Sequence, residues 1–595
     1  MVRDEQKQPS SSQHKNAVLM TGAEVLLRVL VDLGVDVIFG YPGGAVLPIY
    51  DALFQQKTIR HILTRHEQAA VHAAEAYARS TGKVGVILVT SGPGATNVVT
   101  GLVDALMDSI PIVCISGQVF TNLIGNDAFQ EADTVGITRS ATKFNYLIKN
   151  GNVLAKKIRE AFYIARSGRP GPVLIDIPKD ITIKQIPYIN EEINTHPSYR
   201  PKIDPNAKAV FKAVEMMKQA KRPLFYTGGG IINAGLKASL GLNQLVKLTG
   251  FPITSTLMGL GGFDGKDKQF LGMLGMHGTY EANLATHDCD LLIGLGVRFD
   301  DRVTGNVKHF SPRSYKIHAD IDPSQINKIV RVDLPIVGDV AKTIELMIQA
   351  WQEASSKSDY NALKAWWKRI EDWRSVHCLQ YEQDQSPHSI VKPQHAIKRL
   401  YELVTARNLE AFITTEVGQH QMWTAQYFTF DAPNHFMTSG GLGTMGYGLP
   451  ASIGTQVAHP GKLVVDIAGE ASTMMNIQEL ATIKQYRLPV KLFILNNEYM
   501  GMVRQWQELI YDRRYSESYS ESLPDFVRLA ESFGIKGLRV NTVKDLDSII
   551  KEMLDTDGPV LVDVRVEKEE NCYPMIHVGA PHNDILLNPM HKNNA

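Results

Sequence analysis

Short runs of apolar and β-branched residues alternate with longer amphipathic stretches along this chain from about residue 20 onward. A repeated order of strand and helix predicts parallel sheets whose strands are joined by helical crossovers. The chain is therefore expected to have an α/β fold. The clearest apolar runs, which we expect to be buried strands, lie at 84–90, 110–116, 172–177, 223–227, 290–296, 463–469, 490–495 and 559–566.

Two polar segments that contain several prolines interrupt this rhythm and are typical of linkers. The second is expected to be partly helical, with Trp366, Trp367 and Trp373 covering apolar surface. The C-terminal tail either orders over the site when cofactors bind or frays as most termini do. We expect three doubly wound parallel-sheet domains at 20–183, 204–348 and 393–570, linkers at 184–203 and 349–392, a disordered tail at 1–19 and a C-terminal tail at 571–595.

Composition and charge argue against several classes of protein. The 62 basic side chains match 62 acidic ones, so no basic excess points to nucleic acid or to an anionic membrane. The cysteines lie far apart without a CxxC pair, which argues against a disulfide framework and a structural zinc site. The sequence has neither an apolar run long enough for a membrane span nor an apolar signal-peptide segment. A reducing bacterial cytoplasm fits these features.

Three glycine-rich turns follow expected strands, and each exposes backbone N–H groups at the start of a helix. They are SGPGATN (91–97), TGGG (227–230) and SGGLGTMGYG (439–448). Such turns favour anionic groups, because the N–H groups and the helix dipole both attract negative charge. A glycine turn can equally serve only as a tight connection, so each turn alone leaves both interpretations open.

The segment LVVDIAGEAS places a carboxylate at the end of an expected strand. Asn497 follows 27 residues after Glu470, at the end of the next apolar run. Ligands of open α/β sheets bind beyond the carboxyl ends of strands, so these two side chains are placed to share a cation. Magnesium prefers such oxygen ligands, and the backbone carbonyl of Tyr499 could add a third.

These segments resemble the thiamine diphosphate motif, in which a Gly-Asp-Gly turn is followed by Asn-Asn. From about residue 20 to 570 the chain resembles the catalytic subunit of acetohydroxyacid synthase (acetolactate synthase). Ten motifs in the order of that family leave little room for chance. They are FGYPGGA (39–45), RHEQ (65–68), TSGPGATN (90–97), GQVFTNLIGNDAFQEAD (117–133), SGRPGPVLIDIPKD (167–180), GMLGMHG (272–278), GVRFDDRVTG (296–305), VGQHQMW (417–423), SGGLGTMGYGLP (439–450) and GMVRQWQ (501–507).

The metal turn departs from the family pattern. Ala468 replaces an expected aspartate, Glu470 replaces the metal-binding aspartate, and Thr473 stands where an aromatic residue is usual. Glutamate keeps the charge and adds one methylene group, so we interpret Glu470 as a working ligand. The alternative is a solvated carboxylate in a surface turn.

The resemblance implies an enzyme that decarboxylates pyruvate and joins the two-carbon unit to pyruvate or 2-ketobutyrate. The products are 2-acetolactate and 2-aceto-2-hydroxybutyrate, in valine, leucine and isoleucine biosynthesis. It implies the cofactors thiamine diphosphate, Mg²⁺ and a structural FAD. It also implies a homodimer or tetramer with active sites at the subunit interface and a small regulatory subunit. The alternatives are a flavin oxidoreductase like pyruvate oxidase, and a non-catalytic scaffold that has lost its metal site.

The resemblance assigns roles to residues near the reacting atoms. Glu67, which alone would be a favourable charge in the first turn of a helix, is implied to exchange a proton with the pyrimidine ring of the cofactor. The backbone N–H of Gly44 is implied to face the substrate, with Gln130, Phe129 and Lys179 in the same region.

Three further residues are implied to select the second substrate. Arg302 would bind its carboxylate, although an ion pair with Asp300 or Asp301 is the more usual fate of such an arginine. Met502 and Trp506 would form an apolar notch for the ethyl group of 2-ketobutyrate. One methylene group contributes only about 1–3 kcal/mol in such a notch, so selectivity is expected to be moderate.

The remaining matches are implied cofactor contacts. Met445 would lie beneath the bent thiamine diphosphate, a role compatible with simple core packing. The implied contacts of thiamine diphosphate are Val417, Gly418, Gln419, His420, Gly443, Met445, Gly469, Ala471 and Ser472, and those of FAD are Arg169, Gly228, Gly229, Thr256, Leu257, Met258, Gly275, His277, Arg298, Asp322 and Asp339.

Overall fold

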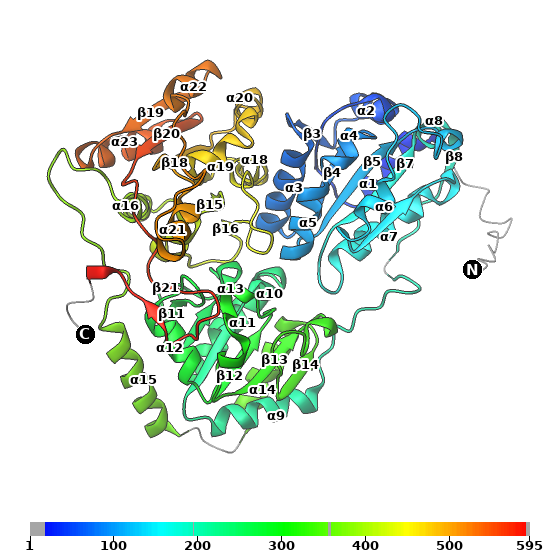
Figure 1. The fold of residues 1–595 in the computed structure, drawn as a ribbon. Helices are drawn as coiled ribbons and strands as arrows, with labels where there is room; N and C mark the ends of the chain where they lie inside the picture. The colour runs from blue at the N-terminus through cyan, green and yellow to red at the C-terminus, as the bar shows by residue number, and fades with distance from the viewer. Residues whose placement is uncertain (1–17, 194, 355–358, 591–595) are drawn as a thin grey trace.

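Three six-stranded parallel sheets form the framework of the protein (Figure 1). The computed structural model describes residues 18–193, 195–354 and 359–590. Each run expected to be a strand forms one, within two residues of its expected bounds. The prediction of three doubly wound α/β domains is confirmed by these sheets.

The N-terminal sheet is buried on both faces, because neighbouring residues of its strands enter two different cores. Val113 packs in one core and Cys114 in the other. The strands in spatial order are β3 (Arg60–Leu63), β2 (Val37–Gly40), β4 (Gly85–Val89), β5 (Ile112–Gln118), β7 (Val173–Pro178) and β6 (Phe144–Leu147), and the main helices are α1 (Gly22–Asp32), α2 (Leu47–Gln55), α3 (Glu67–Thr81), α5 (Val99–Asp108) and α7 (Leu154–Arg166).

The central sheet has the same doubly wound plan. Its strands in spatial order are β11 (Phe270–Met273), β10 (Ile253–Ser255), β9 (Pro223–Thr227), β12 (Leu291–Leu295), β13 (Tyr315–Asp320) and β14 (Leu334–Val337), and its main helices are α9 (Ala207–Gln219), α11 (Leu236–Thr249), α12 (Tyr280–Asp288) and α14 (Val340–Glu353).

The C-terminal sheet repeats this plan a third time. Its strands in spatial order are β16 (Phe436–Met437), β15 (Ala411–Thr415), β17 (Leu463–Gly469), β18 (Lys491–Asn496), β20 (Val560–Arg565) and β19 (Lys536–Val540), and its main helices are α16 (Pro393–Ala406), α17 (Gln419–Tyr427), α18 (Gly448–Ala458), α20 (Leu480–Tyr486), α21 (Gly501–Ile510), α22 (Phe526–Ser532) and α23 (Val543–Asp555).

Each sheet has a topological switch point, where the chain starts to add strands on the opposite side of the strand with which the sheet begins. The switch lies between β2 and β4, between β9 and β12, and between β15 and β17. Crevices at such points are the usual ligand sites of open α/β sheets. The turns at 91–97 and 227–230 follow β4 and β9, Gly418 and Gly469 lie at the ends of β15 and β17, and the turn at 439–448 follows the neighbouring edge strand β16.

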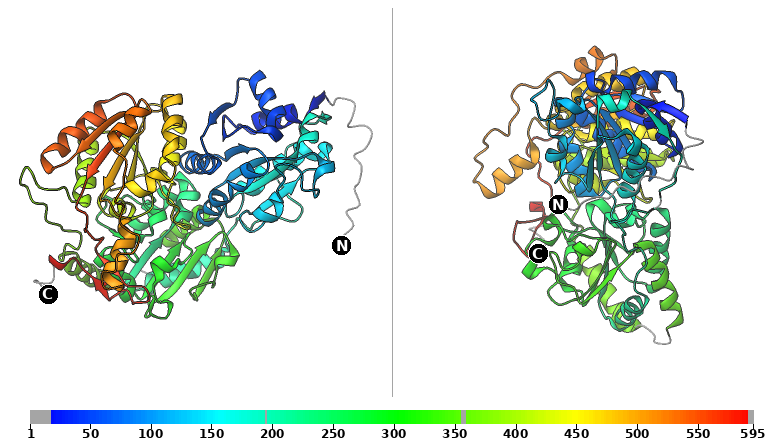
Figure 2. Two further views of the ribbon diagram at one scale, coloured as in Figure 1. Left: turned by 45° about the horizontal axis from the view of Figure 1, so that its top comes forward. Right: turned by 90° about the vertical axis from the view of Figure 1, so that its right-hand side faces the viewer.

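Helices α3 and α18 join the N-terminal and C-terminal domains. A Cβ atom on Gly454 of α18 would lie 1.8 Å from the carbonyl oxygen of Ala73 on α3, so glycine allows the two backbones to touch. Figures 1 and 2 show these two domains side by side, with the central domain below them in Figure 1. The three domains therefore surround a common centre.

The expected linkers and tails contain regular structure. Strand β1 (Val18–Thr21) begins two residues before the expected first domain and pairs with β8 (Gln185–Tyr188) from the first linker. Residues 1–17 of the expected disordered tail lie outside the described residues.

The second linker contains α15 (Tyr360–Arg374), as predicted. On this helix Trp366 is buried and its Nε1 donates to the carbonyl of Pro223 at 3.1 Å, so the helix covers the edge of the central domain. Trp367 and Trp373 pack against the same core as Trp366.

The segment after residue 570 folds back onto the central domain. Its short strands β21 (Met575–Ile576) and β22 (Ile585–Leu586) pair antiparallel. The backbone N–H of Ile576 donates to the carbonyl of Met276 at 2.8 Å.

Candidate active site

Glu470 occupies the end of β17, where it begins the short helix α19 (Glu470–Met474). Its neighbour β18 ends directly before Asn497, so the two predicted metal ligands lie at adjacent strand ends. Glu470 is only 1% exposed, which excludes the alternative of a solvated turn carboxylate. Its Oε1 atom has no hydrogen-bond partner among the described residues.

Burial raises the pKa of Glu470 to about 8, and the backbone N–H groups of Glu470 and Asn497 offset only part of this effect. The Asn497 side-chain oxygen accepts a hydrogen bond from the backbone N–H of Tyr499 at 3.2 Å. A buried carboxyl group with an oxygen atom that no described residue binds, next to an amide oxygen, is the donor set of a hard cation. The residues present therefore fit Mg²⁺.

A small cavity of about 60 Å³ opens beside this turn. Burial lowers the pKa of His420 in its wall to about 3, so the imidazole is neutral. The cavity brings together twelve of the predicted residues, namely Val417, Gly418, Gln419, His420, Met445, Gly469, Glu470, Ala471, Ser472, Asn497, Tyr499 and Met502.

A second cavity, of about 880 Å³, lies where all three domains meet. This volume is in the range of cofactor sites. Val417, Gly418, Met445 and Met502 line both cavities, so the two are neighbours. Its other predicted lining residues are Arg169, Gly228, Gly229, Thr256, Leu257, Met258, His277, Arg298, Arg302, Asp339, Gly443 and Trp506.

Glycines let backbone form part of this larger wall. A Cβ atom on Gly228 would lie 2.6 Å from the carbonyl oxygen of Gly296, across the switch point between β9 and β12. Gly228, Gly229 and Gly230 line the cavity without side chains, so a ligand with a long polar chain could approach their backbone closely, as a flavin dinucleotide requires. The residues present fit FAD.

Two predicted flavin contacts do not line the cavity. Asp322 forms an ion pair at 3.5 Å with Arg169, which does line the cavity, so Asp322 contacts a residue of the wall and not the cavity itself. Gly275 has a φ of 98° and its backbone N–H donates to the Asn283 side chain at 2.8 Å. The sequence pattern predicted correctly that both residues are near the cavity, because their neighbours line it. It could not show that the backbone directs these two residues away from the cavity.

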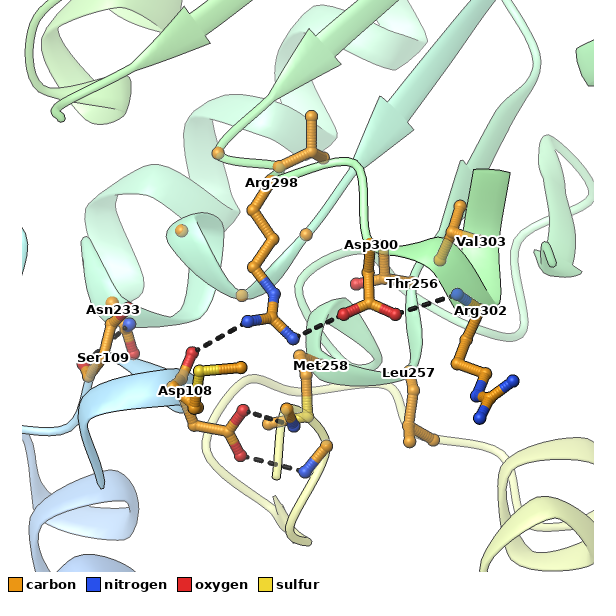
Figure 3. A pocket seen from close by; sticks show the side chains of 18 of the residues that line it. Asp108, Ser109, Asn233, Thr256, Leu257, Met258, Arg298, Asp300, Arg302 and Val303 are labelled. Atoms are coloured by element: carbon orange, nitrogen blue, oxygen red, sulfur yellow. Dashed lines mark hydrogen bonds and ion pairs between the residues drawn. The ribbon is translucent and has the colours of Figure 1, made fainter. Parts of the chain in front are cut away.

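The arginines of the segment 298–302 have different partners (Figure 3). Asp300 pairs with Arg298 at 2.6 Å, and its other oxygen accepts the backbone N–H of Arg302 at 2.9 Å. The guanidinium group of Arg302 approaches Asp301 only at 4.0 Å, on an exposed surface, and lies 5.4 Å from the ring centre of Trp506. The alternative of a close ion pair with Asp300 does not occur.

The three domains also match known protein families. Family models of thiamine pyrophosphate enzymes match the N-terminal binding domain at residues 20–137, the central domain at 210–347 and the C-terminal binding domain at 416–564. The chain is 46% identical over 579 residues to the acetolactate synthase large subunit of Haemophilus influenzae, with 97% of this chain and 100% of that protein covered.

This chain belongs to the acetolactate synthase large-subunit family. The isozyme 3 large subunit of Escherichia coli K12 is 47% identical over 96% of this chain and 99% of its own length. The mitochondrial catalytic subunit of Saccharomyces cerevisiae is 45% identical over 94% of this chain and 83% of its own length.

Five predicted residues of this family member lie elsewhere. The walls of the two cavities contain none of Gly44, Glu67, Phe129, Gln130 and Lys179, all of which belong to the N-terminal domain. Glu67 begins α3 and its Oε2 accepts from Asn97 Nδ2 at 2.9 Å. Phe129 is 90% exposed. Within one chain, the predicted catalytic carboxyl is therefore separate from the predicted metal site.

Sequence patterns missed several polar residues that line the larger cavity, and three of them lie where the N-terminal and central domains meet. Asp108 and Ser109 end α5, and Asn233 ends α10 (Gly229–Asn233). The available signal was a polar Asp-Ser pair directly before a buried strand. Among the described residues, no helix is both long and apolar enough to cross a membrane.

Proposed function

We propose that this chain is the catalytic subunit of an acetohydroxyacid synthase. It decarboxylates pyruvate and condenses the two-carbon unit with a second pyruvate or with 2-ketobutyrate. The products, 2-acetolactate and 2-aceto-2-hydroxybutyrate, lead to valine, leucine and isoleucine. The observation that carries this proposal is the match to acetolactate synthase large subunits along nearly the whole chain.

Glu470 and Asn497 would hold Mg²⁺, with Tyr499 contributing its backbone carbonyl. Each is at the wall of the small cavity. Magnesium takes few protein ligands and completes its octahedron with diphosphate and water oxygens. Because the carboxyl group of Glu470 must lose its proton to bind the ion, metal binding would be coupled to the release of that proton.

Thiamine diphosphate, when bound, supplies the nucleophilic carbon and accepts the electron pair released with CO₂. The turns Gly418–His420 and Gly469–Ser472 would hold its diphosphate, and Met445 would support its bend. The carboxyl group of the partner subunit's Glu67 would exchange a proton with the pyrimidine nitrogen. His420 is neutral, so it adds no charge to the diphosphate side of the site.

Arg302 would bind the carboxylate of the second keto acid. Its exposure on the cavity wall and its weak contact with Asp301 leave the planar guanidinium able to pair with a carboxylate through two N–H groups. The contact of this group with the Trp506 ring would orient it and leave the indole to face the substrate side chain.

The larger cavity would hold FAD. The condensation is not a net oxidation, so the flavin is structural, and its glycine-lined cradle would position the neighbouring walls of the site. We also propose a homodimer or tetramer with sites at the subunit interface, which the separation of Glu67 from Glu470 within one chain supports. We also propose a small regulatory subunit and a cytoplasmic location.

The deciding experiment is an assay of the purified protein for 2-acetolactate from pyruvate, with titrated Mg²⁺ and thiamine diphosphate. We expect activity that requires both cofactors and falls at least about a hundredfold in Glu470→Ala. The matched control is Glu498→Ala, a nearby carboxylate paired with Lys568 outside the cavity walls. Saturating cofactors without acetolactate would refute the proposal.

A further inference from the structure

The loop Ser439–Gly446 carries Gly443 and Met445, two of the proposed cofactor contacts. Met445 lines both cavities, so a shift of this loop changes both. The loop belongs to the C-terminal domain, between β16 and α18. Two of its residues, Gly443 and Gly446, have φ values of 72° and 91°, which glycine adopts without strain.

The first half of the loop is bound by a carboxylate from another domain. Both oxygens of Asp108, at the end of α5, accept backbone N–H groups, from Gly441 at 2.8 Å and from Gly440 at 2.9 Å (Figure 3). The side chain of Asp108 is 2% exposed, and Arg79 lies 3.6 Å away as its counter-charge. Charge-assisted bonds in such a buried place are strong.

A second aspartate of α5 continues the same contact. Asp104 accepts the hydroxyl of Ser439 at 2.9 Å, and the Ser439 hydroxyl oxygen in turn accepts the backbone N–H of Thr444 at 2.8 Å. The far end of the loop is held within its own domain, where Glu416 accepts the N–H groups of Gly446 and Leu449. Carboxyl groups thus hold the loop at both ends.

The end of α5 also binds the central domain. The carbonyl of Met107 accepts from Arg298 Nη1 at 3.3 Å, and the carbonyl of Ser109 accepts from Asn233 Nδ2 at 3.1 Å. Ser109 has a φ of 63°, an unusual conformation for serine, and its hydroxyl accepts from Arg169 Nε at 2.7 Å. This helix end is therefore where the three domains meet.

The loop has little room to move between these partners. A Cβ atom on Gly441 would lie 2.8 Å from Asp108 Oδ1, and one on Gly440 would lie 2.1 Å from Met258 Sδ of the central domain. Only glycine allows the backbone to approach both domains at once.

We propose that Asp108 is a positioning residue of the reaction, which fixes the cofactor-facing loop Ser439–Gly446 against the end of α5. This inference rests on the proposed function for its effect on catalysis, but not for its effect on the loop. In Asp108→Asn the amide keeps one acceptor and turns its NH₂ group toward a glycine N–H, so one backbone donor loses its partner.

The test combines amide hydrogen exchange with steady-state kinetics on the full-length protein. In Asp108→Asn we expect the amides of Gly440 and Gly441 to exchange at least about tenfold faster, without added cofactor and with it. We expect kcat for acetolactate to fall about 10- to 100-fold while KM for pyruvate changes less than about threefold, because misplaced groups lower the rate more than binding. Asp108→Glu should restore part of the rate.

The matched control is Asp36→Asn, an ion-paired aspartate on the outer side of the same domain. It should change neither exchange in the loop nor kcat. Unchanged loop exchange in Asp108→Asn, or faster exchange with unchanged kcat, overturns the inference. If Asp108→Asn does not fold, Ser439→Ala is used in its place, because it removes the hydrogen bond between the same loop and Asp104 of α5. Faster loop exchange with a lower kcat supports the inference, and an unchanged value of either overturns it.

The two proposals fail separately. A wild-type protein that makes no acetolactate refutes the proposed function, and the inference about catalysis fails with it. A wild-type protein that makes acetolactate, with an Asp108→Asn variant of normal kcat, refutes only the positioning role.

Discussion

The carboxyl group of Glu470 shows how burial prepares a residue for a cation. Its pKa is raised to about 8 because the charged form is desolvated. Glutamate, in place of the aspartate expected at this turn, keeps an ionisable group within the cavity wall, next to Asn497. The longer side chain therefore retains the means to bind a metal.

Magnesium binding to the protein with thiamine diphosphate should depend on pH through Glu470. Below pH 8 the ion must displace a proton from this carboxyl, so we expect the apparent Mg²⁺ affinity to fall by up to about tenfold per pH unit from pH 8 to pH 6. Isothermal titration calorimetry at several pH values measures this slope. A pH-independent affinity would show that Glu470 is not a ligand.

Glu470→Gln provides the control in the cofactor-free protein. A raised pKa in the folded state contributes stability that is fully present below the unfolded pKa of about 4.5 and is lost as pH rises through about 8. Glutamine has no proton to lose in this pH range, so the stability of the variant does not fall as the pH rises through about 8. The variant should therefore unfold at a higher temperature than wild type above pH 8, with a difference that shrinks toward pH 5.

Trp506 is expected to set the choice of the second substrate. In Trp506→Leu the apolar notch loses its flat wall and Arg302 loses its stacking partner, so the preference for 2-ketobutyrate over pyruvate should fall about 10-fold or more. Competition between the two keto acids, with both products measured, tests this. The control Tyr360→Leu alters an exposed aromatic residue at the start of α15, outside the walls of both cavities, and should keep the preference.

At the scale of elements, the contact between α3 and α18 joins two domains through small residues. A side chain at Gly454 would push the helices apart, because its Cβ atom would lie 1.8 Å from the Ala73 carbonyl. We expect Gly454→Ala to destabilise the protein by about 1–3 kcal/mol or more. Chemical denaturation measures the change.

Gly558→Ala is the matched control for this substitution. A Cβ atom at Gly558 would meet no atom within 4 Å, so its free energy of unfolding should change by at most about 0.5 kcal/mol. Equal effects of the two substitutions would mean that α3 and α18 do not pack closely in solution.

Helices α3 and α5 also carry a buried group of His72, Glu75 and Asp104 behind the contact. Burial raises the pKa of Glu75 and of Asp104 well above the usual range. Protonated carboxyl groups need no counter-charge, which explains how helix surfaces with several acids pack in the interior.

At the scale of the whole molecule, the proposed site requires two copies of the chain. Glu67→Gln and Glu470→Gln should each abolish activity alone. When the two variants are co-expressed, mixed dimers contain one site with both native residues, so about a quarter of the wild-type activity should return. The specific activity of the whole co-expressed mixture measures this, and no recovery would place the complete site within one chain.

Much of the fold and of the site was predictable from the sequence, for local reasons. Buried parallel strands are continuous apolar runs, so β4, β5, β17 and β20 were found within a residue or two. Glu470 and Asn497 were found because each directly follows such a strand. Glycines marked the turns at the switch points.

Short or polar strands were missed for the same reason. The segments at β3 and β19, on the edges of their sheets, contain charged residues and lack a continuous apolar run. The order of the strands within each sheet could not be predicted from local sequence patterns either, because it depends on how the helices cover the two faces of the sheet.

The sequence by itself determined the α/β class, three units and the local chemistry of each glycine turn and strand end. Only the tertiary structure decided that Asp108 binds Gly440, 332 positions away, that Arg298 turns to Asp300, and that Glu67 lies apart from Glu470. Local patterns record burial and backbone dihedrals, whereas contacts between distant segments depend on which surfaces the whole chain buries together.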